Sequence, residues 1–256
     1  MGIQASLPSA GNNIDALQPS AGRRVRFAVD LLWASLMTAY HAVGFVIAAR
    51  TRANSHPFQR WSRNWARRMF AVFGIAVEST SKTSVEAHCP CVFVANHQNA
   101  LDIPALAIAL PVPFGFVAKA SLRRVPFLGV ALTVSPSVFV DGSEPRKTLE
   151  SMEAAARAVR EGKSVIVFPE GVRTWSRQLE PFKKRAFRLA AEAGVPVIPV
   201  TILDAHLVMD ERRWLATSGT IRIIVGGPIV VDGTDRSSIA LAMDTARQRI
   251  ESNLRL

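Results

Sequence analysis

A histidine and an aspartate five positions apart, His97 and Asp102, are the first residues in the sequence that suggest chemistry. In one continuous helix, side chains with this spacing point roughly 140° away from each other, so the pair can meet only across a turn. Pro104 supports a helix that starts near Asp102, because proline is tolerated in the first turn of a helix and not in its interior. A carboxylate at that helix start can accept the Nδ1 proton of an imidazole folded back over it. Nε2 would then be free to act as a base.

A second stretch carries a carboxylate and a guanidinium, Glu170 and Arg173, in a turn that follows the apolar run Val165 to Phe168. The run before His97, from Cys91 to Ala95, has the same character and predicts a buried strand. Two strands whose following loops carry His, Asp, Glu and Arg indicate one site at the carboxyl edge of a sheet. A packed histidine and a surface ion pair between Glu170 and Arg173 are the structural alternatives at this point.

Four sequence blocks resemble those of one enzyme family. NHQNALD resembles the first block of the glycerolipid acyltransferases, and FPEGVR resembles their Phe-Pro-Glu-Gly-Thr-Arg block. AKASLRRVPFLG, between them, is similar to a stretch in which a lysine precedes Pro-Phe-x-Gly, and VPVIPVTI is similar to a late Val-Pro block. Their order and spacing fit over roughly residues 60 to 231, so the resemblance covers most of the chain.

The resemblance implies an activity: transfer of a fatty acyl chain from acyl-CoA or acyl carrier protein to a lyso-lipid, above all 1-acyl-sn-glycerol-3-phosphate. His97 would be the general base and Asp102 would orient it. The chain has no Gly-x-Ser-x-Gly elbow, so we expect direct attack without an acyl-enzyme. The acyl thioester is then a co-substrate, and no further cofactor is expected.

We expect two sets of substrate-binding residues, the first of which is implied by the resemblance. The acceptor set is Glu170, Gly171 and Arg173. The second set, for the phosphates of the donor's carrier or for lipid head groups, is Lys119, Arg123 and Arg124. For the second set a solvated basic loop is the alternative. A further basic cluster at 183–188 could contact a membrane or an acidic carrier protein, or be a solvated helix face.

One position departs from the family pattern. Where the family has Phe-Ile-Asp-Arg, this chain has Phe139, Val140, Asp141 and Gly142, so the arginine that holds the acceptor's phosphate is absent. Another cation could replace it, and the candidates are Arg123, Arg124, Arg146, Lys147 and Arg173. The departure also leaves two alternative functions: acylation of a lyso-lipid without phosphate, such as a lyso-aminolipid, and a non-catalytic lipid-binding scaffold.

Composition favours a membrane partner. Hydrophobic residues make up 49% of the chain, the formal net charge is +11, and residues 1–96 carry ten Lys or Arg against four Asp or Glu. Basic residues beside apolar surface suit anionic phospholipids. Nucleic acid is not expected, because no nucleic-acid-binding motif is present. Cys89 and Cys91 form no metal-ligand pattern, so no metal site is expected.

The chain divides into three parts. We expect residues 1–22 to be disordered, residues 23–73 to form membrane-associated helices, and residues 74–256 to form the acyltransferase domain. The apolar run Leu31 to Ala49 is long enough to span a bilayer, but arginines flank it on both sides, which favours a helix that dips into one leaflet. The protein would thereby be anchored to the cytoplasmic face of the inner membrane. For residues 57–73, a basic interfacial helix and a helix packed on the core are both open.

From Gly74 onward, strand and helix patterns alternate. This alternation predicts an α/β fold, a mostly parallel sheet with helices on both faces. The expected strands are 75–78, 92–96, 114–118, 137–140, 164–168, 197–202 and 221–225, with 229–231 as a possible edge. The expected helices are 103–110, 145–161, 182–193 and 235–253.

Overall fold

The computed structural model describes residues 20–51, 55–125 and 128–256. Most of the segment predicted to be disordered, residues 1–19, lies outside these ranges. Helix α1 (Ala21–Thr51) begins at Ala21, earlier than expected. At this end of the helix, the hydroxyl oxygen of Ser20 accepts a hydrogen bond from the backbone N–H of Arg23 at 3.4 Å.

The centre of the described chain is a seven-stranded sheet in the order β1-β9-β6-β2-β5-β3-β4. Neighbouring strands run parallel except β6 and β9, which are antiparallel, so the predicted mostly parallel α/β sheet is confirmed. The strands are β1 (Ile75–Ser81), β2 (Val92–Ala95), β3 (Phe114–Lys119), β4 (Val138–Val140), β5 (Ser164–Val167), β6 (Val197–Leu203) and β9 (Gly219–Val225).

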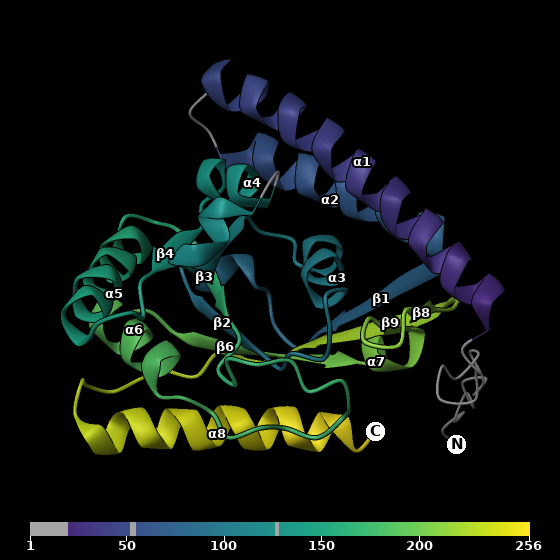
Figure 1. The fold of residues 1–256 in the computed structure, drawn as a ribbon. Helices are drawn as coiled ribbons and strands as arrows, with labels where there is room; N and C mark the ends of the chain where they lie inside the picture. Colours follow the sequence, from purple (N-terminus) through teal and green to yellow (C-terminus); the bar gives the residue numbers. More distant parts are fainter. Residues whose placement is uncertain (1–19, 52–54, 126–127) are drawn as a thin grey trace.

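Helices cover both faces of the sheet, as expected (Figure 1). One face packs against α2 (Ser55–Phe73) and α3 (Asp102–Ala109), with α1 outside α2. The other face packs against α5 (Pro145–Arg160), α6 (Arg185–Ala193) and α8 (Arg236–Leu254). Strand β2 lies between β5 and β6, and its four side chains are all buried. The first site residues therefore follow a buried strand in the interior of the sheet.

Helix α2 packs on the core, which decides between the two alternatives for this segment. Ala66 and Phe70 are buried against the sheet side, and Trp65 donates a hydrogen bond from Nε1 to Thr38 Oγ1 of α1 at 2.9 Å. Trp61 packs edge-on against His41, also of α1. The indole rings of α2 are thus used in helix packing and not as an interfacial face.

Helix α1 has a buried side and an exposed apolar side. Phe27 and Ala34 are buried, whereas apolar residues repeat along the opposite side at helical spacing. The exposed residues include Val25, Val29, Leu32, Leu36, Tyr40 and Val43. Within the described residues, no helix combines the length and the hydropathy needed to cross a bilayer.

Several short elements were not predicted. They are the helix α4 (Leu128–Val134), the short helix α7 (Ala205–Val208), the hairpin of β7 (Met209–Asp210) and β8 (Leu215–Ala216), and 3₁₀ turns η2 (Glu86–His88) and η3 (Ala120–Arg124). The possible edge strand at 229–231 is reduced to one antiparallel bridge between Val197 and Ile229.

Candidate active site

The turn after β2 is fixed to the neighbouring strand β6 before the functional residues begin. Asn96 pairs with the backbone of Ile202 in both directions: its Oδ1 accepts from Ile202 N at 2.7 Å, and its Nδ2 donates to Ile202 O at 2.9 Å. The amide of Asn96 is buried, so these bonds satisfy groups that water cannot reach. The chain therefore leaves β2 in a defined direction at His97.

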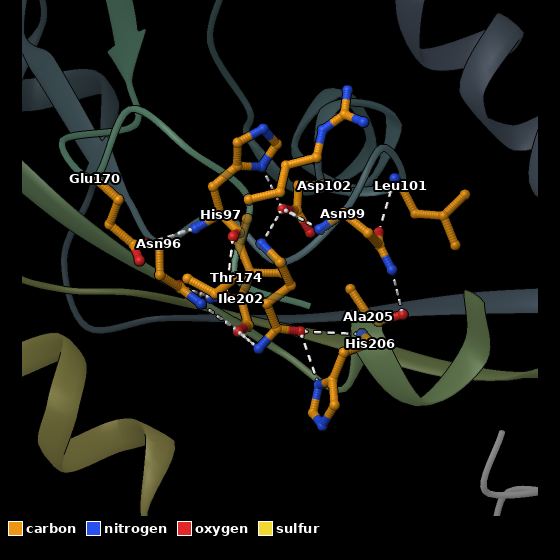
Figure 2. Close-up of polar contacts among 12 residues, drawn as sticks. Asn96, His97, Asn99, Leu101, Asp102, Glu170, Thr174, Ile202, Ala205 and His206 are labelled. Atoms are coloured by element: carbon orange, nitrogen blue, oxygen red, sulfur yellow. Dashed lines mark hydrogen bonds and ion pairs between the residues drawn. The ribbon is translucent and has the colours of Figure 1, made fainter. Parts of the chain in front are cut away.

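His97 and Asp102 meet across the turn, as their spacing predicted. The Nδ1 atom of His97 lies 2.7 Å from Oδ2 of Asp102 (Figure 2). The same Oδ2 accepts hydrogen bonds from the backbone N–H groups of Gln98 at 2.5 Å and Asn99 at 3.1 Å. Asp102 starts α3, so the first residue of that helix holds both the imidazole and the turn that carries it.

The carboxyl of Asp102 is fully buried, which has an electrostatic consequence. Burial raises its pKa, and the hydrogen bonds from His97, Gln98 and Asn99 offset only part of that rise. The second oxygen, Oδ1, is buried without a hydrogen-bond partner among the described residues. A positive charge on the adjacent imidazole is the change that would best stabilise this carboxylate.

The imidazole of His97 is also held from its ring face. It stacks on Phe168, with ring centroids 4.0 Å apart and an interplanar angle of 15°. Only 13% of the side chain is exposed. Phe168 follows β5, so the two adjacent parallel strands β2 and β5 together set the position of the ring.

Glu170, predicted for the acceptor site, lies close to His97, and both of its carboxylate oxygens bind backbone groups. Its Oε1 accepts from the backbone N–H of His97 at 2.9 Å, and its Oε2 accepts from the backbone N–H of Glu180 at 2.8 Å. Burial raises the pKa of this carboxyl despite the two bonds. Glu170 thus ties the loop after β5 to the loop after β2.

A set of amide side chains extends the network to the segment after β6. Asn99 Nδ2 donates to the carbonyls of Ala205 and Met209, at 2.7 and 2.8 Å. Gln98 Oε1 lies 3.2 Å from both the backbone N and Nδ1 of His206. Sequence reasoning missed these residues, although their position next to His97 in the first block was a usable signal.

Arg173 forms an ion pair that the sequence did not predict. Its guanidinium donates to Oε1 of Glu211 at 2.5 Å, and Trp175 Nε1 reaches the same oxygen at 3.3 Å. Glu211 lies between the two strands of the β7–β8 hairpin. The alternative of a surface ion pair between Arg173 and Glu170 is therefore wrong, and the arginine is directed toward this hairpin.

A cavity of about 520 Å³ opens beside the histidine, at the carboxyl ends of β3, β4 and β5. Phe168, which stacks on His97, is one of its lining residues. Val117, Met152 and Leu189 give the cavity an apolar part. The charged residues that line it are Lys119, Asp141, Lys183 and Arg185.

The cavity includes some of the predicted substrate-binding residues and not others. Lys119 and Gly171 line it. Arg123 does not, and its guanidinium lies over the ring of Phe139 at 4.3 Å. Arg124 and Arg173 are likewise outside the lining set.

Residues 76–203, which include the whole of this site except its last loop, match the protein-family model described as Acyltransferase. This span is half of the chain. The chain belongs to the glycerolipid acyltransferase family.

Relatives of known name support the same assignment. The 1-acyl-sn-glycerol-3-phosphate acyltransferase of Haemophilus influenzae is 31% identical over 68% of this chain and 72% of its own length. The chloroplastic 1-acyl-sn-glycerol-3-phosphate acyltransferase BAT2 of Brassica napus is 34% identical over 65% of this chain and 47% of its own length. The chain thus spans about half of the length of the plant relative.

A solved structure has the same fold as this member of the family. The 1-acyl-sn-glycerophosphate (LPA) acyltransferase of Thermotoga maritima superposes with a TM-score of 0.75, over 93% of this chain and 97% of that one. The two sequences are 19% identical, so the likeness concerns the fold alone.

Proposed function

We propose that this protein transfers a fatty acyl chain from an acyl thioester, acyl-CoA or acyl carrier protein, to the free hydroxyl of 1-acyl-sn-glycerol-3-phosphate, giving phosphatidic acid. The observation that carries the proposal is the buried carboxylate–imidazole pair of Asp102 and His97 beside a cavity that is both apolar and basic. The relatives named above act, by their names, on this acceptor.

In the proposed mechanism, His97 is the general base. Because Asp102 accepts the Nδ1 proton, Nε2 carries the lone pair. Nε2 takes the proton of the acceptor hydroxyl while its oxygen attacks the thioester carbonyl, and a tetrahedral intermediate forms. Collapse of the intermediate breaks the carbon–sulfur bond, and the imidazolium returns the proton to the leaving thiolate. Asp102 balances the transient charge on the ring and keeps its orientation.

Glu170 acts in this mechanism as a positioning residue. It contacts the backbone of His97 and not a reacting atom. Since a displacement of about 1 Å can reduce a rate by about 100-fold, two bonds that fix the loop have a kinetic effect. Gly171 contributes to the shape of the same loop. Its φ of +72° belongs to the left-handed region, which favours glycine, and a Cβ added at this position would lie 2.5 Å from Nζ of Lys183.

The exposed apolar side of α1 is the surface that we propose to contact the membrane. Leu32 is 60% exposed and Leu36 is 55% exposed, on a helix side that no other described element covers. Arg67 and Arg68 are exposed on the adjoining α2. Apolar residues beside cations suit the head-group region of anionic lipid. The active site would then receive its acceptor from the cytoplasmic leaflet.

A second candidate function is acylation of a lyso-lipid whose head group has no phosphate. Gly142 favours it, because this position contributes no side chain to the cavity. The remaining basic residues of the cavity weigh against it.

One experiment tests the proposed function and separates it from this alternative. Purified protein is incubated with labelled acyl-CoA or acyl carrier protein and a panel of lyso-lipids with and without phosphate. We expect labelled phosphatidic acid as the main product. Preferred acylation of a phosphate-free acceptor would support the second candidate, and release of free fatty acid alone would contradict both.

A further inference from the structure

The charged residues of the cavity are unevenly balanced. Lys119, Lys183 and Arg185 line it together with a single carboxylate, Asp141. Within the ranges that the structure describes, none of the three cations forms an ion pair. The lining therefore carries an unpaired positive surplus, which an anionic ligand could neutralise.

Asp141 cancels one of the three positive charges, so the lining keeps a net surplus of two. Oδ1 of Asp141 accepts from the backbone N–H of Ser143 at 2.9 Å. The same Ser143, through its side chain and backbone, lowers the pKa of Asp141. These contacts hold the carboxylate of Asp141 within its own turn.

Lys183 is placed by backbone contacts. Its N–H donates to the carbonyl of Pro169 at 2.9 Å, and its ammonium lies in the space left by the missing side chain of Gly171. Pro169 and Gly171 flank Glu170, which holds His97. The ammonium of Lys183 therefore sits on the same loop that positions the proposed base.

Gly142, which lines the same cavity, leaves open space. No heavy atom outside its neighbours in the chain lies within 4 Å of a Cβ built on Gly142, although Gly142 lines the cavity. Three of the five cations that could have replaced an arginine at this position form ion pairs with other residues. Arg146 pairs with Glu150, Lys147 with Glu144 and Arg173 with Glu211.

We propose that Lys183 and Arg185, at the start of α6, bind the phosphate of the acceptor lipid in the cavity that Gly142 also lines. This inference rests on the proposed function and deepens it. It assigns phosphate recognition to residues that follow β5, in place of a side chain at position 142. A phosphate with two negative charges matches an ammonium and a guanidinium, each of which donates charge-assisted hydrogen bonds.

The test uses the double variant Lys183→Gln/Arg185→Gln in the full chain. With acyl-CoA as donor, we expect KM for 1-acyl-sn-glycerol-3-phosphate to rise by about 10- to 100-fold, because two charge-assisted contacts are lost. KM for acyl-CoA and kcat should stay within about threefold of wild type, because the change removes ground-state binding of one substrate. Lys184→Gln is the matched control: it removes the same charge from an adjacent exposed residue that does not line the cavity.

A charge-restoring variant makes the test specific. Adding Gly142→Arg to the double variant should lower KM for 1-acyl-sn-glycerol-3-phosphate again by about tenfold or more, because the open space at Gly142 admits the arginine side chain. Phosphate-free 1-acylglycerol is the second acceptor, and its KM should not change. The single variant Arg185→Gln, with a smaller rise in KM, gives the same answer if the double variant does not fold.

The outcomes separate this inference from the proposed function. If the wild-type protein acylates the phosphate-bearing acceptor and the double variant keeps its KM, the inference is wrong and the proposed function stands. A rise in KM for acyl-CoA instead would place the donor's phosphates at Lys183 and Arg185 and would also overturn it. If the wild-type protein acylates no phosphate-bearing acceptor, both fail.

Discussion

The carboxylate of Glu170 accepts a hydrogen bond from the backbone N–H of His97 at 2.9 Å, across 73 positions of sequence. Its other oxygen accepts from Glu180 N at 2.8 Å. Both loops leave the carboxyl ends of adjacent parallel strands, β2 and β5. One buried acidic side chain therefore joins the loop of the proposed base to the loop that begins the cavity wall.

Replacing Glu170 with Gln should weaken both stability and turnover. The amide offers one acceptor where the carboxylate offers two, so a partly buried backbone N–H, of His97 or of Glu180, loses its partner. Such a loss costs about 1–3 kcal/mol of unfolding free energy. Loss of the hydrogen bond to its backbone should also displace the His97 side chain, and this displacement should lower kcat by about tenfold or more. Urea unfolding and steady-state kinetics measure the two effects.

Glu180→Gln, the same change on an exposed side chain, is the control, and equal behaviour of both variants would contradict the positioning role.

Asp204 predicts a pH dependence of stability. Burial raises the pKa of this carboxyl, but hydrogen bonds and charge from Arg177 and Arg222 outweigh burial and leave the pKa below its ordinary value of 3.8. A lowered folded-state pKa stabilises the fold above 3.8, and this contribution is lost as pH falls through the folded-state value. Asp204→Asn should therefore cost about 1–2 kcal/mol of unfolding free energy at pH 7.

The difference between wild type and Asp204→Asn should then narrow as the pH is lowered from about 5 to about 3. Asparagine is the suitable replacement because Asp204 has a φ of +69°, a conformation that asparagine tolerates. Urea unfolding at several pH values measures the effect. A difference that stays constant over this range would show that the two arginines do not hold the carboxylate.

The exposed side of α1 predicts lipid binding that depends on apolar surface. Leu32→Gln/Leu36→Gln should reduce binding to anionic phosphatidylglycerol vesicles by about tenfold or more, since each leucine contributes roughly 1.5–3 kcal/mol when fully buried. Co-sedimentation measures the bound fraction. Leu149→Gln/Leu241→Gln removes two exposed leucines from α5 and α8 instead and is the control. Equal loss in both double variants would contradict a docking role for α1.

Local sequence signals predicted a large part of the fold and of the site. The pair His97 and Asp102 was predictable because both residues belong to one turn, whose helix start is marked by Pro104. The order of strands and helices followed from alternating apolar patterns. The antiparallel pairing of β9 with β6 was not predictable, because an apolar run carries no information on strand direction.

The contacts that sequence reasoning missed join residues far apart in the chain. Arg173 pairs with Glu211, 38 positions away, in a hairpin whose strands are too short to give a periodic pattern. Lys183 and Arg185 were predicted only as part of a basic cluster, because their place in the cavity depends on how α6 packs on the sheet. The backbone contacts of both Glu170 oxygens were missed because its motif gives no sign of them, and its place in the acceptor site stays a prediction.

The central claim is that Nε2 of His97 removes the proton of the acceptor hydroxyl while Asp102 orients the ring. The most direct measurement is single-turnover transfer from labelled acyl-CoA to 1-acyl-sn-glycerol-3-phosphate by wild type, His97→Ala and Asp102→Asn, each checked for an unchanged circular dichroism spectrum. We predict that both variants bind the acceptor and that the transfer rate falls by about 10²- to 10⁴-fold. Transfer at the wild-type rate by either folded variant would contradict the account.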